Sequence, residues 1–283
     1  MENQQVGIVG AGWAGAAFAR LWQQSGGNCW GTTTREERQN ALRDEGLTAH
    51  LLHLDAPSEQ LEVAMPFCSE MVLAFPPGGK NGDRSQYPQR LEAALTSGWK
   101  KGCRHFFMLS STSVYRNTGT WIDEDHKDHL KPESAVRRGE EAFWRGLNRL
   151  GADEAYGLVF RLAGLFGPGR HPGKWLAGRS FTHDGSAPVN LVHQADVAGA
   201  LKLAITSKPR PGIYNLCCAT HPSKKQCYGN AAKQLKQQPP AFTPGVQEGF
   251  KLVARQKWIA ESGYRYRYSD VERAIRELEP GTP

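Results

Sequence analysis

The segment near the amino terminus that runs from Val6 to Leu21 constrains the fold more than any other part of the sequence. It places an apolar strand, a Gly-x-Gly-x-x-Gly turn and an amphipathic helix in direct succession. The glycines allow a tight turn, close approach of the backbone to a pyrophosphate, and packing of the helix on the strand. N–H groups at the start of such a helix attract anions. The segment therefore predicts a dinucleotide site; a tight turn without a ligand is the alternative. The expected cofactor-binding residues are Gly10, Gly12, Trp13, Ala14 and Gly15.

Strand-like and helix-like segments alternate after this turn, which is typical of a parallel sheet covered on both faces. We expect an α/β fold, namely a Rossmann doubly wound parallel sheet over residues 1–163 and a smaller C-terminal substrate lobe over 164–283. Residues 189–216 are expected to return to the sheet. Glycine and proline crowd into the start of the lobe, as in loops that build ligand sites. Strands are predicted at 28–34, 51–54, 70–75, 105–109 and 156–162, and helices at 36–45, 87–99 and 133–150.

Composition narrows the function classes. The net charge of +7 comes from basic residues that are spread along the chain among 28 acids, so we expect no nucleic-acid partner. No apolar stretch approaches the ~20 residues of a membrane-spanning helix, and we expect no membrane partner and a cytoplasmic location. The six cysteines lack Cys-x-x-Cys spacing, which indicates buried thiols and no metal site. Alternating aromatic and basic residues at Gly263 to Tyr268 suggest either base stacking or a segment that packs on the lobe.

The end of the second predicted strand bears on the choice of cofactor. An acid there binds the ribose 2′-hydroxyl of NAD, whereas an arginine accommodates the 2′-phosphate of NADP. The chain has Thr34 and Arg35 at this place, with Arg38 one helical turn later. These residues favour NADP. Solvated charges at a helix start are the alternative, and the next acid, Glu36, keeps NAD open.

The motif Ser110-Ser111-Thr112-Ser113-Val114-Tyr115 resembles the extended short-chain dehydrogenase/reductases, the family of NAD(P)-dependent epimerases and dehydratases. The stretches Phe160 to Gly173 and Val189 to Val197 strengthen the resemblance. Together with Ile213 to Leu216 and the segment Trp258 to Tyr268, they look most similar to the bacterial YeeZ-like subgroup of atypical members. The similarity runs nearly end to end, and its motifs are specific for the family rather than for a substrate.

The resemblance implies roles for three residues that follow the fifth strand. Ser111 matches the catalytic serine or threonine of the family, whose hydroxyl bonds a substrate hydroxyl or carbonyl. Ser110 is expected to bind the cofactor and Thr112 the substrate. Dehydratase members carry acidic groups at Thr112 and Ser113, so the resemblance argues against dehydration by that route. The alternative is that these hydroxyls only end a strand and cap a turn.

The family pairs a tyrosine with a lysine four residues later, but residues 131–141 contain no tyrosine. Arg137 is our candidate for the electrostatic and ribose-binding role of the lysine, although arginine is a poor proton shuttle. An ion pair between Arg137 and Glu133 is the alternative. The missing acid would then be Ser111 acting through water, or a loop histidine.

Further candidates follow from the resemblance. Phe75, Pro76 and Pro77 are expected to line the adenosine side of the cofactor site, with a simple strand end as the alternative. Arg170 and His171 follow a Gly-Pro-Gly turn and are expected to contact substrate, as is His193; loop exposure and a packing role are the alternatives.

The sequence thus leads to two hypotheses of different classes. The first is an NADP-binding oxidoreductase or epimerase-like enzyme with an atypical active site, acting on a small polar or nucleotide-linked substrate. The second is a non-catalytic NADP-binding regulatory or interaction protein. A homodimer is compatible with both.

Overall fold

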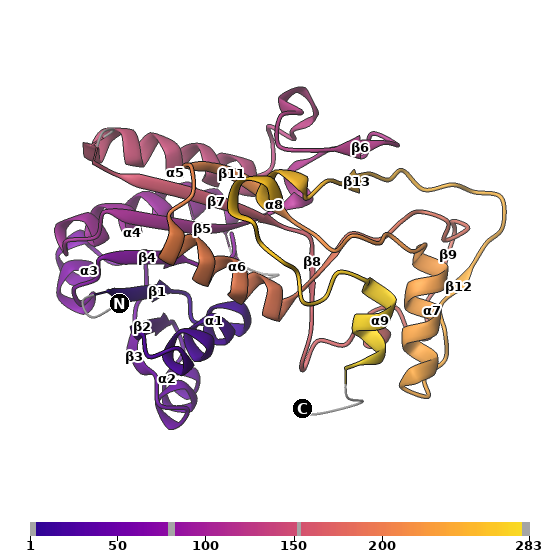
Figure 1. The fold of residues 1–283 in the computed structure, drawn as a ribbon, viewed down its shortest axis with the longest axis horizontal. Coiled ribbons are helices and arrows are strands. Elements are labelled where there is room, and N and C mark those ends of the chain that lie inside the picture. The colour runs from indigo at the N-terminus through magenta and orange to yellow at the C-terminus, as the bar shows by residue number, and fades with distance from the viewer. Residues whose placement is uncertain (1–3, 79–82, 152–153, 279–283) are drawn as a thin grey trace. The chain divides into compact units, whose positions relative to one another are not determined.

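The computed structural model describes residues 4–78, 83–151 and 154–278. Its main feature is a seven-stranded sheet in the order β3-β2-β1-β4-β5-β7-β11 (Figure 1). The pairs β3–β2, β2–β1, β1–β4 and β4–β5 run parallel. This order confirms the predicted Rossmann doubly wound sheet, because the direction of strand addition reverses at β1. The strands of this sheet are β1 (Gln5–Val9), β2 (Asn28–Thr33), β3 (Thr48–Leu51), β4 (Glu70–Leu73), β5 (His105–Ser111), β7 (Tyr156–Leu162) and β11 (Gly212–Leu216).

Helices cover both faces of the sheet, as central parallel strands that are apolar on both sides require. On one face, α3, α4 and α5 pack over a core that includes Met71, Leu91 and Phe143. On the other face, α1 and α6 lie side by side (Figure 1), and Lys202 Nζ donates a hydrogen bond to Ser25 Oγ at 2.6 Å. These helices are α1 (Trp13–Gln24), α2 (Glu36–Asp44), α3 (Ser58–Ala64), α4 (Tyr87–Lys100), α5 (Ala135–Gly151) and α6 (Gln194–Ser207).

The third strand lies earlier than the sequence predicts. We expected residues 51–54, but β3 is Thr48–Leu51, in register with Trp30 to Thr33 of β2. The chain then leaves the sheet through a turn in which Ala56 N–H donates to His53 O at 3.0 Å. The prediction placed the strand on Leu51, Leu52 and Leu54, but only Leu51 is paired with β2 and the other two leucines follow it.

The helix predicted from Glu133 begins instead at Ala135. A turn precedes it, in which Ser134 N–H donates to Lys131 O at 3.1 Å, and Pro132 lies within that turn. Glu133 is therefore outside the helix. This placement matters for the ion pair considered below, because helical i to i+4 spacing does not extend back to Glu133.

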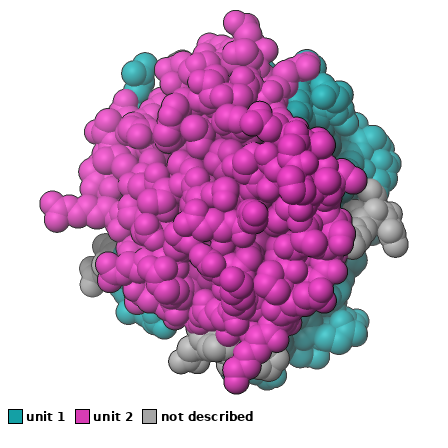
Figure 2. Space-filling model, turned by 90° about the vertical axis from the view of Figure 1, so that its right-hand side faces the viewer, with its two compact units in different colours: residues 1–114, 131–161, 198–214 teal, residues 115–130, 162–197, 215–283 magenta. Residues whose placement is uncertain are grey.

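The chain groups into two compact units, which are coloured separately in Figure 2. Unit 1 comprises residues 1–114, 131–161 and 198–214, and unit 2 comprises 115–130, 162–197 and 215–283. The sequence-based boundary at residue 163 stays a prediction of domain organisation. Of the returning segment 189–216, β11 joins the main sheet, whereas β10 pairs with β8.

The described part of unit 2 contains short strand pairs, the helices α7, α8 and α9, and the short 3-10 helices Lys127–His129 and Pro172–Lys174. Its core includes Phe166, Leu191, Cys218 and Ile275. All three strand pairs are parallel: β8 with β10, β6 with β13, and β9 with β12. Its elements are β6 (Trp121–Ile122), β8 (Gly164–Phe166), β9 (Ser180–Phe181), β10 (Leu191–His193), α7 (Lys224–Gln234), β12 (Ala241–Phe242), β13 (Leu252–Val253), α8 (Gln256–Ser262) and α9 (Val271–Arg276).

Cysteine placement agrees with the expectation of reduced thiols. All six cysteines are buried and none forms a disulfide. Cys29, Cys68 and Cys103 belong to unit 1, and Cys217, Cys218 and Cys227 belong to unit 2.

Candidate functional site

The glycine turn connects β1 to α1 at the carboxyl edge of the sheet. Gly10 has φ +93°, a conformation that favours glycine, and its N–H donates to Thr32 Oγ1 at 3.0 Å. Ala11 N–H donates to the carbonyl of Thr32 at 2.7 Å. The turn is therefore held on β2 by both the side chain and the backbone of one buried threonine, which the sequence analysis did not single out.

The three glycines of the motif have different surroundings. A Cβ at Gly10 would lie 2.8 Å from Phe75 N, and one at Gly15 would lie 2.7 Å from Gly10 O, so both positions are closed by backbone. A Cβ at Gly12 would meet nothing within 4 Å in the described part of the chain, and Gly12 is exposed. Gly12 is also the N-cap residue of α1, where it offers no side chain to cap the helix. The open position thus coincides with the end of the helix that attracts anions.

Arg35 and Arg38 differ in what they contact. Arg35 is exposed, and its guanidinium forms no ion pair or side-chain hydrogen bond with the residues that the structure describes. Arg38 is half-buried and lies 3.6 Å from a carboxylate oxygen of Glu45. Thr34 is exposed next to Arg35. Of the two arginines, Arg35 is the one whose charge is uncompensated within unit 1.

The residues after β4 form the wall next to the glycine turn. Ala74 N–H donates to Val9 O at 2.9 Å, which brings the ends of β4 and β1 together. The half-buried ring of Phe75 packs edge-on against Tyr87, with 5.7 Å between ring centroids. Pro76 is exposed and Pro77 half-buried. This wall lies at the switch point of the sheet, where α/β folds of this type bind ligands.

A buried polar network lies at the end of β5. The carboxylate of Glu140 on α5 is fully buried and accepts two hydrogen bonds from Arg161 on β7, at 2.9 and 2.6 Å. Ser110 Oγ donates to the same carboxylate at 2.6 Å. Bidentate pairing of this kind compensates both buried charges. Glu140 and Arg161 were missed by the sequence analysis.

Ser111 follows Ser110 in β5, and Arg137 precedes Glu140 by three residues on α5. Ser111 is half-buried, and its Oγ accepts a hydrogen bond from Ser113 N–H at 3.1 Å. This bond caps the turn after β5, as the alternative to a catalytic role expects. Arg137 pairs with Glu141 at 3.0 Å and reaches Glu140 at 3.9 Å, with its side chain 25% exposed. The alternative pairing of Arg137 with Glu133 is wrong, because Glu133 precedes the helix and accepts a bond from Arg138 at its carbonyl. Thr112 is buried in the turn that follows β5.

Tyr87 packs against α5, and it does not replace the family's tyrosine. Its ring is 1% exposed and lies so close to Gly139 that a Cβ there would be 2.3 Å from it. Its hydroxyl donates to Phe75 O at 3.4 Å. Burial, and secondarily the negative charge of Glu140, raises the pKa of Tyr87. A phenol that is buried and harder to ionise is a poor proton shuttle.

The candidate substrate residues Arg170 and His171 belong to unit 2. Arg170 is exposed at a turn closed by its own N–H, which donates to Gly167 O at 2.9 Å. His171 is 5% exposed, and its Nδ1 accepts from Gly173 N–H at 3.0 Å. Burial lowers the pKa of His171, so its ring is neutral near pH 7. Its Nε2 is buried and has no hydrogen-bond partner in the described structure.

His193 follows the same pattern. It is 3% exposed between the rings of Phe166 and Tyr268, at centroid distances of 5.1 and 3.8 Å. Its Nδ1 accepts from Ala195 N–H at 3.1 Å, where α6 begins. Burial, and then the charge of Arg267, lowers the pKa of His193 to about 4. These contacts describe a packing histidine, which was the alternative to a substrate contact.

The aromatic and basic segment from Gly263 to Tyr268 packs on unit 2. The buried carboxylate of Asp196 accepts hydrogen bonds from Arg267 N–H at 2.7 Å and from Tyr268 N–H at 3.0 Å. Tyr264 OH lies 3.2 Å from the same carboxylate. These bonds anchor the segment within unit 2, which was the alternative to base stacking.

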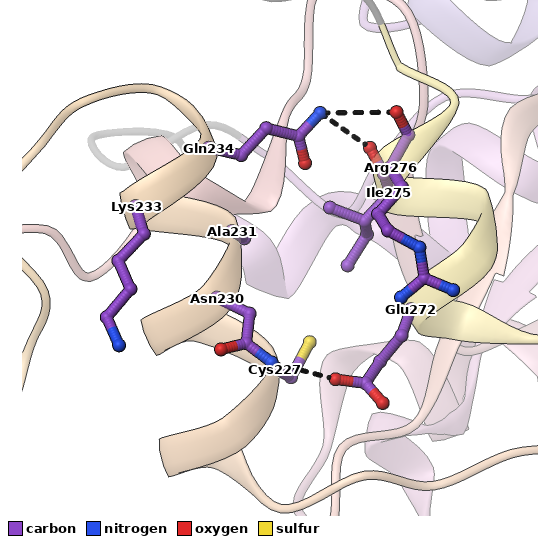
Figure 3. Close-up of a pocket in the computed structure, with 8 residues that line it drawn as sticks. All are labelled: Cys227, Asn230, Ala231, Lys233, Gln234, Glu272, Ile275 and Arg276. Atoms are coloured by element: carbon purple, nitrogen blue, oxygen red, sulfur yellow. Dashed lines mark hydrogen bonds between the residues drawn. The ribbon is translucent and has the colours of Figure 1, made fainter.

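A pocket with a volume of about 610 Å³ lies between α7 and α9, and Figure 3 shows the residues that line it. Its polar groups bond one another: Asn230 Nδ2 donates to Glu272 at 3.0 Å, and Gln234 Nε2 donates to the carbonyl of Ile275 at 3.2 Å. None of the predicted site residues lines it. The pocket therefore lies between two packed helices, and Asn230, Gln234 and Glu272 of its lining are hydrogen-bonded across it.

The described residues offer neither a metal site nor a membrane-spanning helix. No group of three or more His, Cys, Asp or Glu side chains in residues 4–78, 83–151 and 154–278 could hold a metal ion. Over the same ranges, no helix is long and apolar enough to span a bilayer.

Comparison with known proteins decides the family. The sequence model of the NAD dependent epimerase/dehydratase family matches residues 6–217, which include the glycine turn, Ser110, Glu140 and Arg161. The chain belongs to this family. A relative from Escherichia coli strain K12, Protein YeeZ, is 30% identical over 273 residues, covering 94% of this chain and 97% of the relative. The predicted resemblance is confirmed.

Solved structures agree with this epimerase/dehydratase fold. A conserved protein of unknown function from Silicibacter pomeroyi has a TM-score of 0.71 at 22% identity and covers 98% of both chains. UDP-glucose 4-epimerase of Thermus thermophilus, solved with NAD, has a TM-score of 0.75 at 15% identity and covers 96% of this chain and 98% of its own.

The sequence does hold a signal for the pair of Glu140 and Arg161. Arg161 interrupts the apolar run of β7 as a single charge, which by itself demands a buried partner. Glu140 lies on the buried face of α5, beside Gly139 and Phe143. A single arginine in an apolar strand and a glutamate on the buried face of the facing helix can be expected to pair.

Proposed function

We propose that this chain is an NADP-binding oxidoreductase or epimerase-like enzyme with an atypical active site that lacks the Tyr-x-x-x-Lys pair. The observation that carries the proposal is the open position at Gly12, at the start of α1, between two glycines that backbone atoms close off. A ligand whose phosphates approach the backbone uses this opening, and Gly10, Trp13, Ala14 and Gly15 complete the turn.

The preference for NADP over NAD rests on Arg35. Its exposed guanidinium has no partner among the described residues, and it follows β2, where the 2′-substituent of the adenosine ribose is read. Thr34 supplies a neighbouring hydroxyl, and Phe75, Pro76 and Pro77 would line the adenosine side. The Thermus thermophilus epimerase is described with NAD, so the 2′-phosphate distinguishes our proposal from what that protein binds.

When bound, the dinucleotide supplies a hydride donor or acceptor. In our proposal, Ser111 hydrogen-bonds the reacting oxygen of the substrate, and Arg137 orients the cofactor ribose and stabilises negative charge. Arg137 keeps its proton, so it cannot act as the acid. Because residues 131–141 contain no tyrosine, the proton is exchanged with water through Ser111.

The substrate in this proposal is a small polar or nucleotide-linked molecule. Thr112 and Arg170 are the proposed polar contacts, with Arg170 exposed and positively charged for an anionic group. His171 and His193 are assigned to the internal packing of unit 2, because both are neutral and buried. A cytoplasmic location, a homodimer, and the absence of nucleic-acid and membrane partners stay predictions.

Calorimetry tests the cofactor assignment. We expect NADP to bind more tightly than NAD, and Arg35→Ala to remove most of that difference. Arg43→Ala is the matched control, because Arg43 is on the helix that follows Arg35 but its guanidinium is bonded to the carbonyl of Ala49 at 3.0 Å. Tighter binding of NAD that Arg35→Ala leaves unchanged would refute the assignment.

Turnover is tested separately, with NADPH absorbance against a panel of carbonyl compounds and with interconversion of nucleotide sugars. We expect Ser111→Ala to lower kcat on any accepted substrate by about 100-fold. No turnover with any substrate, together with tight NADP binding, would favour the second candidate, a non-catalytic NADP-binding regulatory protein. The absence of tyrosine from residues 131–141 and the burial of Tyr87 favour that candidate.

A further inference from the structure

The proposed function leaves the Glu140 network unexplained. The ion pair between Glu140 and Arg161 is fully buried, and burying it costs desolvation energy. Apolar residues of similar size would often stabilise the fold equally well. In this chain the pair has a third member, Ser110, which ends on the same carboxylate. The network therefore connects the core of unit 1 to the carboxyl end of β5.

The hydrogen bonds of the network fix which way Ser110 Oγ points its proton. Both carboxylate oxygens of Glu140 accept from Arg161, and arginine keeps its proton at all relevant pH values. The carboxylate is an acceptor only, so the 2.6 Å contact requires Ser110 Oγ to be the donor. A hydroxyl has one proton and two lone pairs. Once its proton is committed to Glu140, Ser110 can only accept a further hydrogen bond.

Ser110 also lies at the ligand edge of the sheet. It is the penultimate residue of β5, which is the neighbour of β4, and β4 is the neighbour of β1. The carboxyl ends of these strands carry Ser110, Phe75 and the glycine turn, so the three belong to one edge. Ser110 is thus placed at the same edge of the fold as the proposed cofactor.

We infer that Ser110 Oγ is a dedicated hydrogen-bond acceptor for an N–H or O–H group of the bound dinucleotide, and that Glu140 and Arg161 are positioning residues that impose this polarity. The inference rests on the proposed function. It adds a requirement on the ligand, which must offer a donor at this place. A ligand that offers only an acceptor there would set its lone pairs against those of Ser110 Oγ, so neither group would gain a hydrogen bond and the ligand would bind poorly.

The test measures dissociation constants for NADP by calorimetry. Ser110→Ala keeps the Arg161 and Glu140 pair, so we expect a folded protein that binds NADP about threefold to tenfold more weakly, the loss of one neutral hydrogen bond. Ser97→Ala is the control. Ser97 is a buried serine of α4 outside the site, and its loss should leave the dissociation constant unchanged.

A double-mutant cycle separates positioning from general support of the fold. We expect Glu140→Gln to weaken NADP binding, and adding Ser110→Ala to Glu140→Gln to cause no further loss. Additive losses would mean that Glu140 acts only through stability and would overturn its positioning role. If Glu140→Gln does not fold, the comparison of Ser110→Ala with the unaltered protein still decides the acceptor role.

An analogue of NADP with an acetyl group in place of the carboxamide identifies the donor. If the carboxamide N–H is the donor, the unaltered protein should favour NADP over the analogue, and Ser110→Ala should remove that preference. If a ribose hydroxyl is the donor, Ser110→Ala should weaken both ligands equally. Equal NADP affinity of Ser110→Ala and the unaltered protein would overturn this inference alone, whereas no dinucleotide binding by the unaltered protein would overturn the proposed function as well.

Discussion

The geometry of the glycine turn depends on Thr32, a residue outside the glycine motif. Its hydroxyl accepts from Gly10 N–H, and its carbonyl accepts from Ala11 N–H. Thr32 is 2% exposed, so water cannot take over the bond to Gly10. A motif that reads as three glycines is therefore completed by the neighbouring strand.

We expect Thr32→Val to lower the free energy of unfolding by about 1–3 kcal/mol, because it keeps the shape of the side chain but leaves Gly10 N–H buried without an acceptor. Urea denaturation measures the change. Thr32→Ser, which keeps the hydroxyl, is the control and should lose less. If the valine variant unfolds at the same urea concentration as the unaltered protein, the hydroxyl does not hold the turn.

His193 makes the stability of the protein depend on pH. Its pKa is lowered to about 4 in the folded state, against ~6.5 in an unfolded chain, so the folded state prefers the neutral ring. The stability that the neutral ring contributes to the folded state is fully present above pH 6.5 and is lost as the pH falls from 6.5 through about 4. At pH 5 the loss amounts to roughly 2 kcal/mol.

The variant His193→Asn keeps an acceptor for Ala195 N–H but does not titrate in this range. We expect it to be less stable at pH 7.5, because the ring contacts with Phe166 and Tyr268 are gone, yet to lose less stability between pH 7.5 and pH 5. Thermal unfolding at several pH values gives the two slopes. Parallel slopes would show that His193 does not account for the acid sensitivity.

Among the secondary-structure elements, α5 shows how closely two helices can approach. Gly139 lies against the ring of Tyr87 on α4, where a Cβ would be 2.3 Å from a ring carbon. At Gly146, two turns later, a Cβ would lie 2.7 Å from Leu95 on the same neighbouring helix. Both glycines are buried, and together they set the distance between α4 and α5 over the core.

Gly139→Ala is expected to lower the melting temperature, since overpacking a tight helix contact costs about 1–3 kcal/mol. Gly229→Ala is the matched control. Gly229 is also within a helix, α7, but a Cβ there would meet nothing within 4 Å among the described residues, so the gain in helix propensity of roughly 0.5–1 kcal/mol should appear unopposed. A stabilising effect of alanine at both positions would contradict the packing argument.

The elements that the sequence predicted well are those with strong local signals. The β1–turn–α1 segment combines an apolar strand with glycines at fixed spacing, and β7 is one largely apolar run. The boundaries of β3 and α5 were missed, because they are set by pairing with β2 and by the turn at Pro132. The pair of Glu140 and Arg161 was missed because its members are far apart in sequence and meet only through the packing of α5 on the sheet.

Asp196 makes a long-range connection in the protein, because it ties the start of α6 to a segment about 70 residues later in the chain. Its carboxylate accepts from two successive backbone N–H groups, those of Arg267 and Tyr268. Such anchoring cannot be predicted from local sequence, since an aspartate near the start of a helix is usually a solvated residue of its first turn.

Asp196→Asn should loosen this connection, because the amide can accept at one atom only. We expect the amide hydrogens of Arg267 and Tyr268 to exchange with deuterium at least tenfold faster, by mass spectrometry of peptides covering 264–270. Peptides from β1 and β4 serve as the reference within the same protein and should be unchanged. Unaltered exchange in the segment would show that ring packing alone holds it.

The rate at which the six cysteines react with a thiol reagent can report how often each part of the protein unfolds. All are buried and none forms a disulfide, and each compact unit contains three of them. A thiol reagent should therefore be inert toward the native chain and should modify each unit only when that unit opens. Variants that retain cysteines in one unit would report how long each half of the protein stays closed, without any attached label.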